Sequence, residues 1–532
     1  MGGIGISRRP AVLAAVVLAL VASVILHGIG RGEFDPTYDE AAHAITGVFF
    51  RDFFRDLPLL NAQQYAFRYY AQYPALGLIH WPPLFHVAEG LVFTLFGPSV
   101  VAARLTVALF CMLGAVFWYR LVSRLHSPGL AALSTIVLAT LPEILRCEKS
   151  VILEMPSLAL CIVASYYWVV YLETGVVGNA YRFAATAGLA LLTKQHSVYL
   201  AFFCLLTLVL LNGWKLMRPR RVAGAVALGL VLVVPYYALT MRLHRHTIAA
   251  DVLQGGAHPG RFTFYWTALP QAGGWVVLCL AVAGLVSWRG WADSRAFRVM
   301  IAWVAASYLM LLAFAQTEAR YSIYWLPAIA FFASGVFFIR TTVPPIRVVL
   351  AAAGMLLAGA NLWGAWQFRK PATNGYLEAA KALVSRGPGG VVLYDGAASH
   401  DFIFFVRLLD RDRKWYVLRK NLYVARINWD YGRKVLAHSE ADLRELIADY
   451  GVRYFAVQDP NHEYAPIQKT LREYLAGPNF KLIQRVAIGG DIPGDQDVGV
   501  LLYLNPNWSK PRKTTLTVPM MTLDHDIEVP LN

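Results

Sequence analysis

Residues 11–30 read AVLAAVVLALVASVILHGIG, and residues 31–43 read RGEFDPTYDEAAH. The first stretch matches the roughly 20 apolar residues that an α-helix needs to cross a bilayer. A signal peptide shares its basic start (Arg8 and Arg9) and apolar run, so that alternative stays open, but no clear small-residue cleavage pattern follows. We interpret the stretch as a first membrane-spanning helix, with the acidic pair Asp39 and Glu40 just beyond its end.

The first 370 residues repeat this apolar pattern. Further apolar segments cover about residues 99–122, 129–146, 151–172, 181–193, 195–212, 222–243, 273–288, 298–315, 321–339 and 346–366. Together with the first they predict about eleven spans. The whole chain of 532 residues is 57% hydrophobic and 15% charged, with a mean hydropathy of +0.47. This composition excludes a disordered chain and argues against a purely soluble one.

The net charge of +15 would be typical of a nucleic-acid-binding protein if it were spread over a polar surface. It is concentrated in the apolar part. Residues 1–370 carry 28 Lys and Arg against 14 Asp and Glu, whereas residues 371–532 carry 20 against 19. Lys and Arg mark the cytoplasmic ends of membrane helices, so we expect no nucleic-acid partner.

The positions of the basic residues predict the orientation. With a cytoplasmic N-terminus, the cytoplasmic loops contain Arg120 and Arg124; Lys215, Arg218, Arg220 and Arg221; Arg289, Arg295 and Arg298; and Arg340 and Arg347. An odd number of spans then places residues 371–532 outside the cytoplasm. We predict a polytopic α-helical protein of the plasma or inner membrane, with a transmembrane domain over 1–370, a long outer loop over 31–98 and an extracytoplasmic domain over 371–532.

The last 162 residues change character. Val391–Tyr394, Trp415–Leu418, Tyr454–Val457 and Gly499–Leu504 read as strands, and Ala441–Tyr450 has apolar residues at helical spacing. Strands that alternate with helices indicate a small α/β domain, which we interpret as a cap or an acceptor-recognition domain. The chain has five cysteines, no CxxC pair and no metal-ligand spacing. No cofactor and no metal site are predicted, although the sequence leaves dependence on a divalent metal open.

Polar residues gather on the outer side of the predicted topology. Two carboxylates at the end of a membrane helix, with His43 one turn later, are costly unless they are solvated or used. As a structural alternative, they form an acidic first turn that a helix dipole favours. The other polar residues on this side are His80 and Trp81 before Pro82-Pro83; Arg104 at the start of a span; Glu148 and Glu154 in a turn; Lys194; and Arg320 with Tyr321. The apolar run Leu84–Phe96 is too short to span, and we expect it to lie in the interface.

In the order and placement of these motifs, the chain resembles the GT-C membrane glycosyltransferases. The members that it resembles most are the dolichyl-phosphate-mannose–protein mannosyltransferases and their relative, the bacterial aminoarabinose transferase. The resemblance covers about residues 10–340. It is carried by Asp39-Glu40, Pro82-Pro83-Leu84, Ala103-Arg104-Leu105, Glu154-Met155-Pro156, Thr193-Lys194, Arg320-Tyr321 and Leu326-Pro327. Bacterial relatives often have Lys before the two prolines, where this chain has Trp81.

The resemblance implies a role for each of these residues. Asp39 would be the catalytic carboxylate, with Glu40 beside it. The donor phosphate would be bound by Arg104, Lys194 and Arg320, with His80 or Arg104 in place of the missing lysine. The cavity or acceptor site would include His43, Trp81, Glu148, Glu154 and Tyr321.

The reaction that the resemblance implies is consistent with these residue types. Asp39 takes the proton of an acceptor hydroxyl, which attacks the anomeric carbon of a sugar on a polyprenyl phosphate, with inversion. Cations stabilise the leaving phosphate without a metal. The donor and membrane lipids are the expected partners, and the acceptor is a protein, a lipid or a polysaccharide. Two alternatives stay open: a transporter or flippase of lipid-linked sugars, and a non-catalytic receptor or assembly protein.

Overall fold

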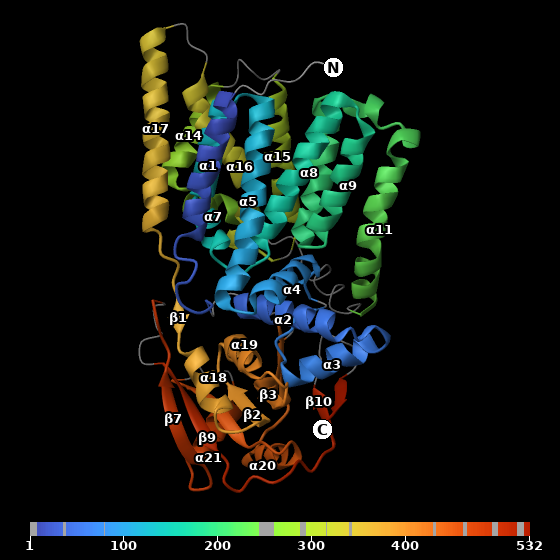
Figure 1. The fold of residues 1–532 in the computed structure, drawn as a ribbon, viewed down its shortest axis with the longest axis vertical. Coiled ribbons are helices and arrows are strands. Elements are labelled where there is room, and N and C mark those ends of the chain that lie inside the picture. The colour runs from blue at the N-terminus through green and yellow to red at the C-terminus, as the bar shows by residue number, and fades with distance from the viewer. Residues whose placement is uncertain are drawn as a thin grey trace.

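The computed structural model describes residues 8–35, 39–78, 80–243, 260–287, 294–314, 316–339, 343–428, 432–460, 465–491, 498–518 and 526–531. The chain forms a bundle of roughly parallel and antiparallel helices and then a region with β-sheets at one end of that bundle (Figure 1). The basic loop residues Arg289 and Arg340 lie outside the described residues, as do residues 36–38 and 79 of the quoted motifs.

The bundle is built from long apolar helices. They are α1 (Arg8–Leu26), α5 (Val100–Leu125), α8 (Glu154–Thr174), α9 (Val177–Leu191), α10 (Tyr199–Leu210), α11 (Pro219–Leu243), α15 (Arg295–Ala313), α16 (Leu326–Gly335) and α17 (Pro344–Gln367). Within the described residues, five helices have the length and composition to cross a membrane: α5, α8, most of α11, α15 and α17. As expected, residues 181–212 form two segments rather than one, because the chain turns at Lys194.

Two apolar runs are broken rather than straight. α6 (Pro128–Ala139) and α7 (Pro142–Glu148) meet at 69°, so the apolar run expected over 129–146 is a bent helix pair rather than one straight helix. Pro142 starts α7 because a proline cannot continue the preceding helix but fits a helical first turn. α13 (Gly260–Gly273) and α14 (Trp275–Ser287) meet at 111° at Gly274, whose φ of +76° suits glycine. Counting each pair as one span gives seven, and the expected eleven stays a prediction.

The long loop after α1 forms helices that lie across one end of the bundle. They are α2 (Glu40–Asp56), α3 (Ala62–Gln72) and α4 (Leu84–Phe96). Figure 1 shows α2 and α4 between the bundle and the β-containing region. α4 packs on α2 and α5, and the N–H of Leu84 donates to the carbonyl of Leu192 at 2.9 Å. The run expected to be too short to span is thus a helix laid across the bundle end.

The β-containing region has one main sheet with strand order β3-β2-β6-β9-β7. β2 (Gly390–Asp395) pairs in parallel with both β3 (Trp415–Arg419) and β6 (Tyr454–Asp459). β9 (Gly499–Leu504) pairs antiparallel with β6 on one side and with β7 (Lys481–Ala487) on the other. The helices are α18 (Tyr376–Val384), α19 (Ser399–Leu409), α20 (Glu440–Asp449) and α21 (Pro466–Leu475). Short pairs join β1 (Thr373–Asn374) to β8 (Gly489–Gly490), β4 (Val424–Asn428) to β5 (Gly432–Val435), and β10 (Thr515–Val518) to β11 (Ile527–Pro530). The four expected strands fall within β2, β3, β6 and β9, which confirms an α/β region.

The end of α1 is tied to the start of this region. The Glu33 carboxylate accepts hydrogen bonds from the N–H groups of Tyr376 at 2.9 Å and Leu377 at 3.1 Å. It therefore caps the N-terminus of α18 from a distant part of the chain. Arg31 also pairs with Asp491, at 2.7 Å, directly after β8.

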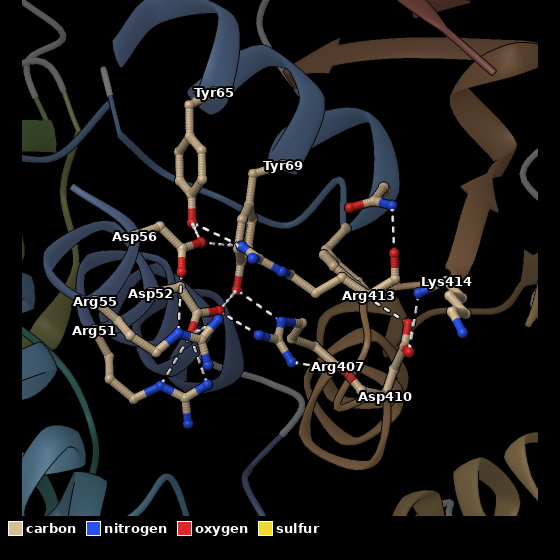
Figure 2. A network of polar contacts seen from close by, with 12 residues as sticks. Arg51, Asp52, Arg55, Asp56, Tyr65, Tyr69, Arg407, Asp410, Arg413 and Lys414 are labelled. Carbon is tan, nitrogen blue, oxygen red and sulfur yellow. Dashed lines mark hydrogen bonds and ion pairs between the residues drawn. The ribbon is translucent and has the colours of Figure 1, made fainter. Parts of the chain in front are cut away.

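A second tie joins α2 and α3 to α19 and the loop after it (Figure 2). Asp52, on α2, is fully buried. It accepts hydrogen bonds from Arg407 of α19, from Tyr69 of α3 at 2.8 Å and from Arg51 at 2.6 Å. Nearby, Asp56 pairs with Arg413 at 2.6 Å. The loop helices and the β-containing region thus share one buried ionic network.

Candidate active site

The loop after α1 places two neighbouring carboxylates in different surroundings. Asp39 is the N-cap residue of α2, yet its side chain makes no capping hydrogen bond. It is partly exposed, and within the described ranges no ion pair involves it. Glu40, by contrast, is fully buried and pairs with Lys370 just after α17. Of the two acids, Asp39 is the one that is open to a reaction partner.

The surroundings of Asp39 favour its protonated form. Burial is the largest influence and raises the pKa of the Asp39 carboxyl above its ordinary value. The charges of Arg320 and His80 oppose this rise, while Glu154 and Glu318 add to it. These four groups come from three separate segments of the chain, so the fold gathers them around Asp39.

Glu154, the first residue of α8, holds two cations at this end of the bundle. Its Oε1 accepts a hydrogen bond from Lys194 Nζ at 2.6 Å and lies 3.1 Å from Arg320 Nε. The Glu154 side chain is 1% exposed, and the two cations are 10% and 14% exposed. Buried charges held in this way cost no rearrangement when a second anion arrives. The structure therefore brings three predicted site residues into one preorganised cluster.

Glu318 and Tyr321 extend the cluster toward its surface. Glu318 Oε2 lies 2.7 Å from Arg320 Nε, and the Tyr321 hydroxyl donates to Glu318 Oε1 at 3.1 Å. Lys194 Nζ is 4.8 Å from the centre of the Tyr321 ring, within range of a cation–π interaction. The ring thus covers the lysine on one side while Glu154 holds it on the other.

Trp81 lies between the predicted histidines. The His43 ring centre is 4.1 Å from that of Trp81, and His80, which is exposed, is 5.2 Å away on its edge. Burial lowers the pKa of His43 well below its ordinary value, so this histidine is neutral, and its Nδ1 shares a 3.0 Å hydrogen bond with His86 Nε2. A Cβ added to Gly77 would come within 2.0 Å of the Trp81 ring, so a glycine is needed there.

Arg104 lies apart from this cluster. It is buried at the start of α5, where its guanidinium donates to the carbonyls of Ile29 at 3.0 Å, Arg31 at 2.7 Å and Glu33 at 2.6 Å. The structure thus uses Arg104 to hold the turn after α1 rather than placing it beside Lys194 and Arg320. Glu148 is also apart: it is buried at the end of α7, next to Lys149.

Two residues of the site were missed in the sequence. Lys370 pairs with the buried Glu40, and Glu318 binds both Arg320 and Tyr321. Glu318 stands only two residues before Arg320, so its charge was a usable signal. Lys370 is 330 residues from Glu40, and nothing local in the sequence connects them. Within the described residues, no group of three or more His, Cys, Asp or Glu side chains could hold a metal ion.

The sequence matches one protein family. Residues 80–238 match the family described as dolichyl-phosphate-mannose-protein mannosyltransferase. That range includes Trp81, Glu154 and Lys194, and it ends before Arg320. A comparison with curated proteins finds no match.

Solved structures resemble the chain over most of its length. ArnT from Cupriavidus metallidurans bound to undecaprenyl phosphate has a TM-score of 0.59 and 15% identity, covering 92% of this chain and 99% of that one. The apo oligosaccharyltransferase of Archaeoglobus fulgidus has a TM-score of 0.54 and 9% identity, covering 86% and 70%. Arabinofuranosyltransferase AftD from Mycobacteria has a TM-score of 0.51 and 17% identity, covering 96% and 40%.

These structural similarities are at low identity and establish the fold, while the family match covers part of the bundle. The chain is thus an integral membrane protein that shares the fold of these glycosyltransferase structures, and residues 80–238 of its bundle match the mannosyltransferase family.

Proposed function

We propose that this protein transfers a sugar from a polyprenyl-phosphate-linked donor to an acceptor hydroxyl, with Asp39 as the base. The observation that carries the proposal is the arrangement at the bundle end. A carboxylate with a raised pKa and no ion pair among the described residues stands in the field of Arg320, one of two cations that Glu154 holds in place. A general base and a phosphate-stabilising pair are the two components that this reaction needs.

The reaction is a single displacement. The acceptor oxygen forms a bond to the anomeric carbon while the bond from that carbon to the phosphate oxygen breaks. The acceptor proton passes to Asp39, and the polyprenyl phosphate leaves. Because one displacement occurs, the configuration at the anomeric carbon inverts. A phosphate is a good leaving group, so this scheme has no second carboxylic acid, unlike a glycosidase.

Lys194 and Arg320 would stabilise the negative charge that develops on the phosphate. Glu154 fixes both cations before the substrate binds, and Glu318 adds a second contact to Arg320. The lipid in the ArnT structure, undecaprenyl phosphate, supports a donor of this class.

We further propose that the reaction takes place on the outer face of the membrane. The cation-rich loops expected in the cytoplasm and the acidic loop after α1 belong to opposite ends of the predicted spans. Residues 371–532 would then form an extracytoplasmic domain over the site, and the N-terminus would be cytoplasmic. Labelling of single cysteines by a membrane-impermeant reagent in intact cells would test this orientation.

The test of the function is transfer by isolated membranes. Membranes with the wild-type chain receive radiolabelled hexoses and pentoses on undecaprenyl phosphate, and glycosylated products are extracted. Asp39→Asn should reduce transfer by about 10²–10⁴-fold at equal expression, the range of a lost general base. Glu378→Gln, an exposed acid on α18, is the matched control and should retain full transfer.

Two results would overturn the proposal. Full transfer by Asp39→Asn removes Asp39 from the mechanism. Movement of the intact lipid-linked sugar across proteoliposomes, with no new glycosidic bond, would indicate a flippase instead.

A further inference from the structure

A cationic cavity lies beside Lys370, the ion-pair partner of Glu40. Its space, open solvent included, is about 470 Å³. It is bounded by the end of α1, the start of α5, the end of α7 and the segment after α17. Lys370 is part of its wall, and its partner Glu40 neighbours Asp39 in the chain. The residues of the Glu154 cluster do not line it.

The cavity wall carries an excess of positive charge. Its five cations are Arg31, Arg104, Lys149, Arg369 and Lys370, and its one acid is Glu148. Only two of the five have carboxylate ion pairs among the described residues, Arg31 with Asp491 and Lys370 with Glu40. The remaining three, Arg104, Lys149 and Arg369, have no carboxylate within ion-pair distance among the described residues, although Glu148 is the neighbour of Lys149 and Glu40 and Asp35 act on Arg104 from farther away.

Those three cations are nevertheless held in place. Lys149 Nζ donates to the carbonyls of Val24 at 2.8 Å and His27 at 2.7 Å. Arg369 donates to His27 Nε2 at 2.8 Å, since a guanidinium has no acceptor, and His27 stacks on Trp366 with ring centres 4.0 Å apart. Carbonyl and imidazole dipoles orient Lys149 and Arg369 without neutralising them, and the single acid Glu148 leaves the cavity wall with an excess of positive charge that an anion could balance.

Two buried polar atoms in the cavity wall have no hydrogen-bond partner within the described part of the chain. They are Arg104 Nε and Glu148 Oε1, on residues that are 5% and 3% exposed. Buried polar atoms are nearly always paired in folded proteins, because an unpaired one keeps its full desolvation cost. A phosphate oxygen in the cavity would accept from Arg104 Nε and, if the Glu148 carboxyl is protonated, from that group too.

An apolar cavity adjoins the cationic one. It lies among α1, α5, α6 to α7 and α8, with a space of about 400 Å³, open solvent included, and is lined by side chains such as Val21, Leu138 and Ile162. The two cavities share Ile25 and Glu148. A cationic cavity at helix ends joined to an apolar one between helices has the two parts of a membrane amphiphile, a charged headgroup and a hydrocarbon chain.

We propose that these joined cavities bind a lipid with a phosphate-bearing headgroup, at a site separate from the donor site. The phosphate lies among Arg104, Lys149 and Arg369, and the start of the hydrocarbon chain enters the apolar cavity. Bilayer phospholipids and polyprenyl phosphates share this chemistry. The site stands on its own observations and does not require the proposed transfer reaction.

The test is lipid binding to the purified full-length protein by native mass spectrometry after delipidation. The probes are dioleoyl phosphatidylglycerol, undecaprenyl phosphate, dioleoyl phosphatidylcholine and inorganic phosphate. We expect one tightly held anionic lipid and weaker binding of the zwitterionic lipid. Arg369→Ala combined with Arg31→Ala should weaken that binding by about tenfold or more, as for lost charge-assisted contacts. Both arginines are exposed, so these changes should leave folding intact.

Controls separate this site from the donor site and from general charge effects. Arg386→Ala, an exposed arginine after α18, should leave lipid binding unchanged, and Arg369→Lys should retain most of it. Lys194→Gln should abolish sugar transfer but leave binding of the anionic lipid unchanged. Tighter binding of phosphatidylglycerol identifies a bilayer lipid, and tighter binding of undecaprenyl phosphate identifies the polyprenyl carrier. Equal binding of all the lipids, or binding unchanged in the double variant, would overturn the proposal.

Discussion

At the scale of single residues, one buried carboxylate determines the geometry of the candidate site. Glu154 contacts both Lys194 and Arg320, although these cations come from segments far apart in the chain. Without Glu154 the two cations would repel each other in a poorly solvated site. Glu154, which the resemblance placed in the cavity as a second acid, therefore serves to hold the two cations in position.

Replacing Glu154 with Gln should reduce both stability and transfer. Two buried cations would lose their shared counter-charge, and breaking a buried ion pair from one side typically costs about 3–5 kcal/mol. We expect a lower melting temperature in detergent and a kcat/KM for transfer reduced by at least about tenfold. Glu318→Gln is the comparison, because its side chain is 41% exposed and Glu154 would still hold Arg320. A smaller loss in Glu154→Gln than in Glu318→Gln would contradict this role.

The pH dependence of transfer should report on Asp39. Its pKa is raised, so the carboxylate that acts as a base is lost as the pH falls through a value above that of an ordinary aspartate. The acid limb of kcat/KM should therefore lie at a higher pH than for a solvated aspartate. Arg320 lowers the pKa of Asp39, so Arg320→Gln should move this limb to still higher pH. A limb that does not move in that variant would show that another group titrates.

At the scale of helices and strands, the loop helices matter because they join the bundle to the β-containing region. α2 and α3 supply Asp52 and Tyr69, while α19 supplies Arg407 (Figure 2). The Tyr73 hydroxyl donates to Asp410 Oδ2 at 2.7 Å in the same interface. Since Asp39 is the N-cap residue of α2, this interface fixes the helix that carries the proposed base.

Loss of Arg407 should therefore weaken the attachment of the β-containing region. Arg407→Ala leaves Asp52 buried with fewer partners and should cost about 3–5 kcal/mol, whereas Tyr73→Phe removes one hydrogen bond and should cost about 1 kcal/mol. Limited proteolysis and thermal unfolding of the purified protein would measure both. Equal stability of the two variants would contradict the network.

The same interface should be sensitive to acid. Burial alone would raise the pKa of Asp52, but Arg407 and Arg51 outweigh it, and the net pKa is lowered. A lowered pKa contributes stability that is complete above the unfolded pKa of about 3.9 and is lost as the pH falls through the folded value. The difference in stability between wild type and Arg407→Ala should accordingly shrink in strong acid.

Much of the element pattern was predictable from the sequence, because apolar runs and alternating strands depend on neighbouring residues. Proline at 142 and glycine at 274 were local signals for the two breaks, although the angles of 69° and 111° depend on packing. For the cluster around Glu154, the sequence predicted only that its residues lie on the same side of the membrane, and it did not predict their contacts with one another. Contacts such as that between Glu40 and Lys370 depend on the complete fold, and no local sequence pattern predicts them.

At the scale of the whole molecule, the positive charge has two distinct uses. Most of the net charge of +15 belongs to residues 1–370, where it follows the expected cytoplasmic ends of the helices. At the opposite end, cations occur in two groups: Lys194 and Arg320 around Glu154, and the wall of the cationic cavity. Lys370 of the cavity wall pairs with Glu40, the chain neighbour of Asp39, and this pair links the first loop to the end of the last helix.

This link has a consequence for how the protein is made. Glu40 and Asp52 leave the ribosome long before their partners, since Lys370 follows Glu40 by 330 residues and Arg407 follows Asp52 by 355. During synthesis the first loop must wait for these partners: Glu40 has no ion pair until Lys370 follows the last helix, and Asp52 has only its contacts with Arg51 and Tyr69 until α19 has been made. A nascent chain stalled before residue 370 would therefore present an incomplete, acidic loop that membrane quality-control proteases could distinguish from the finished protein.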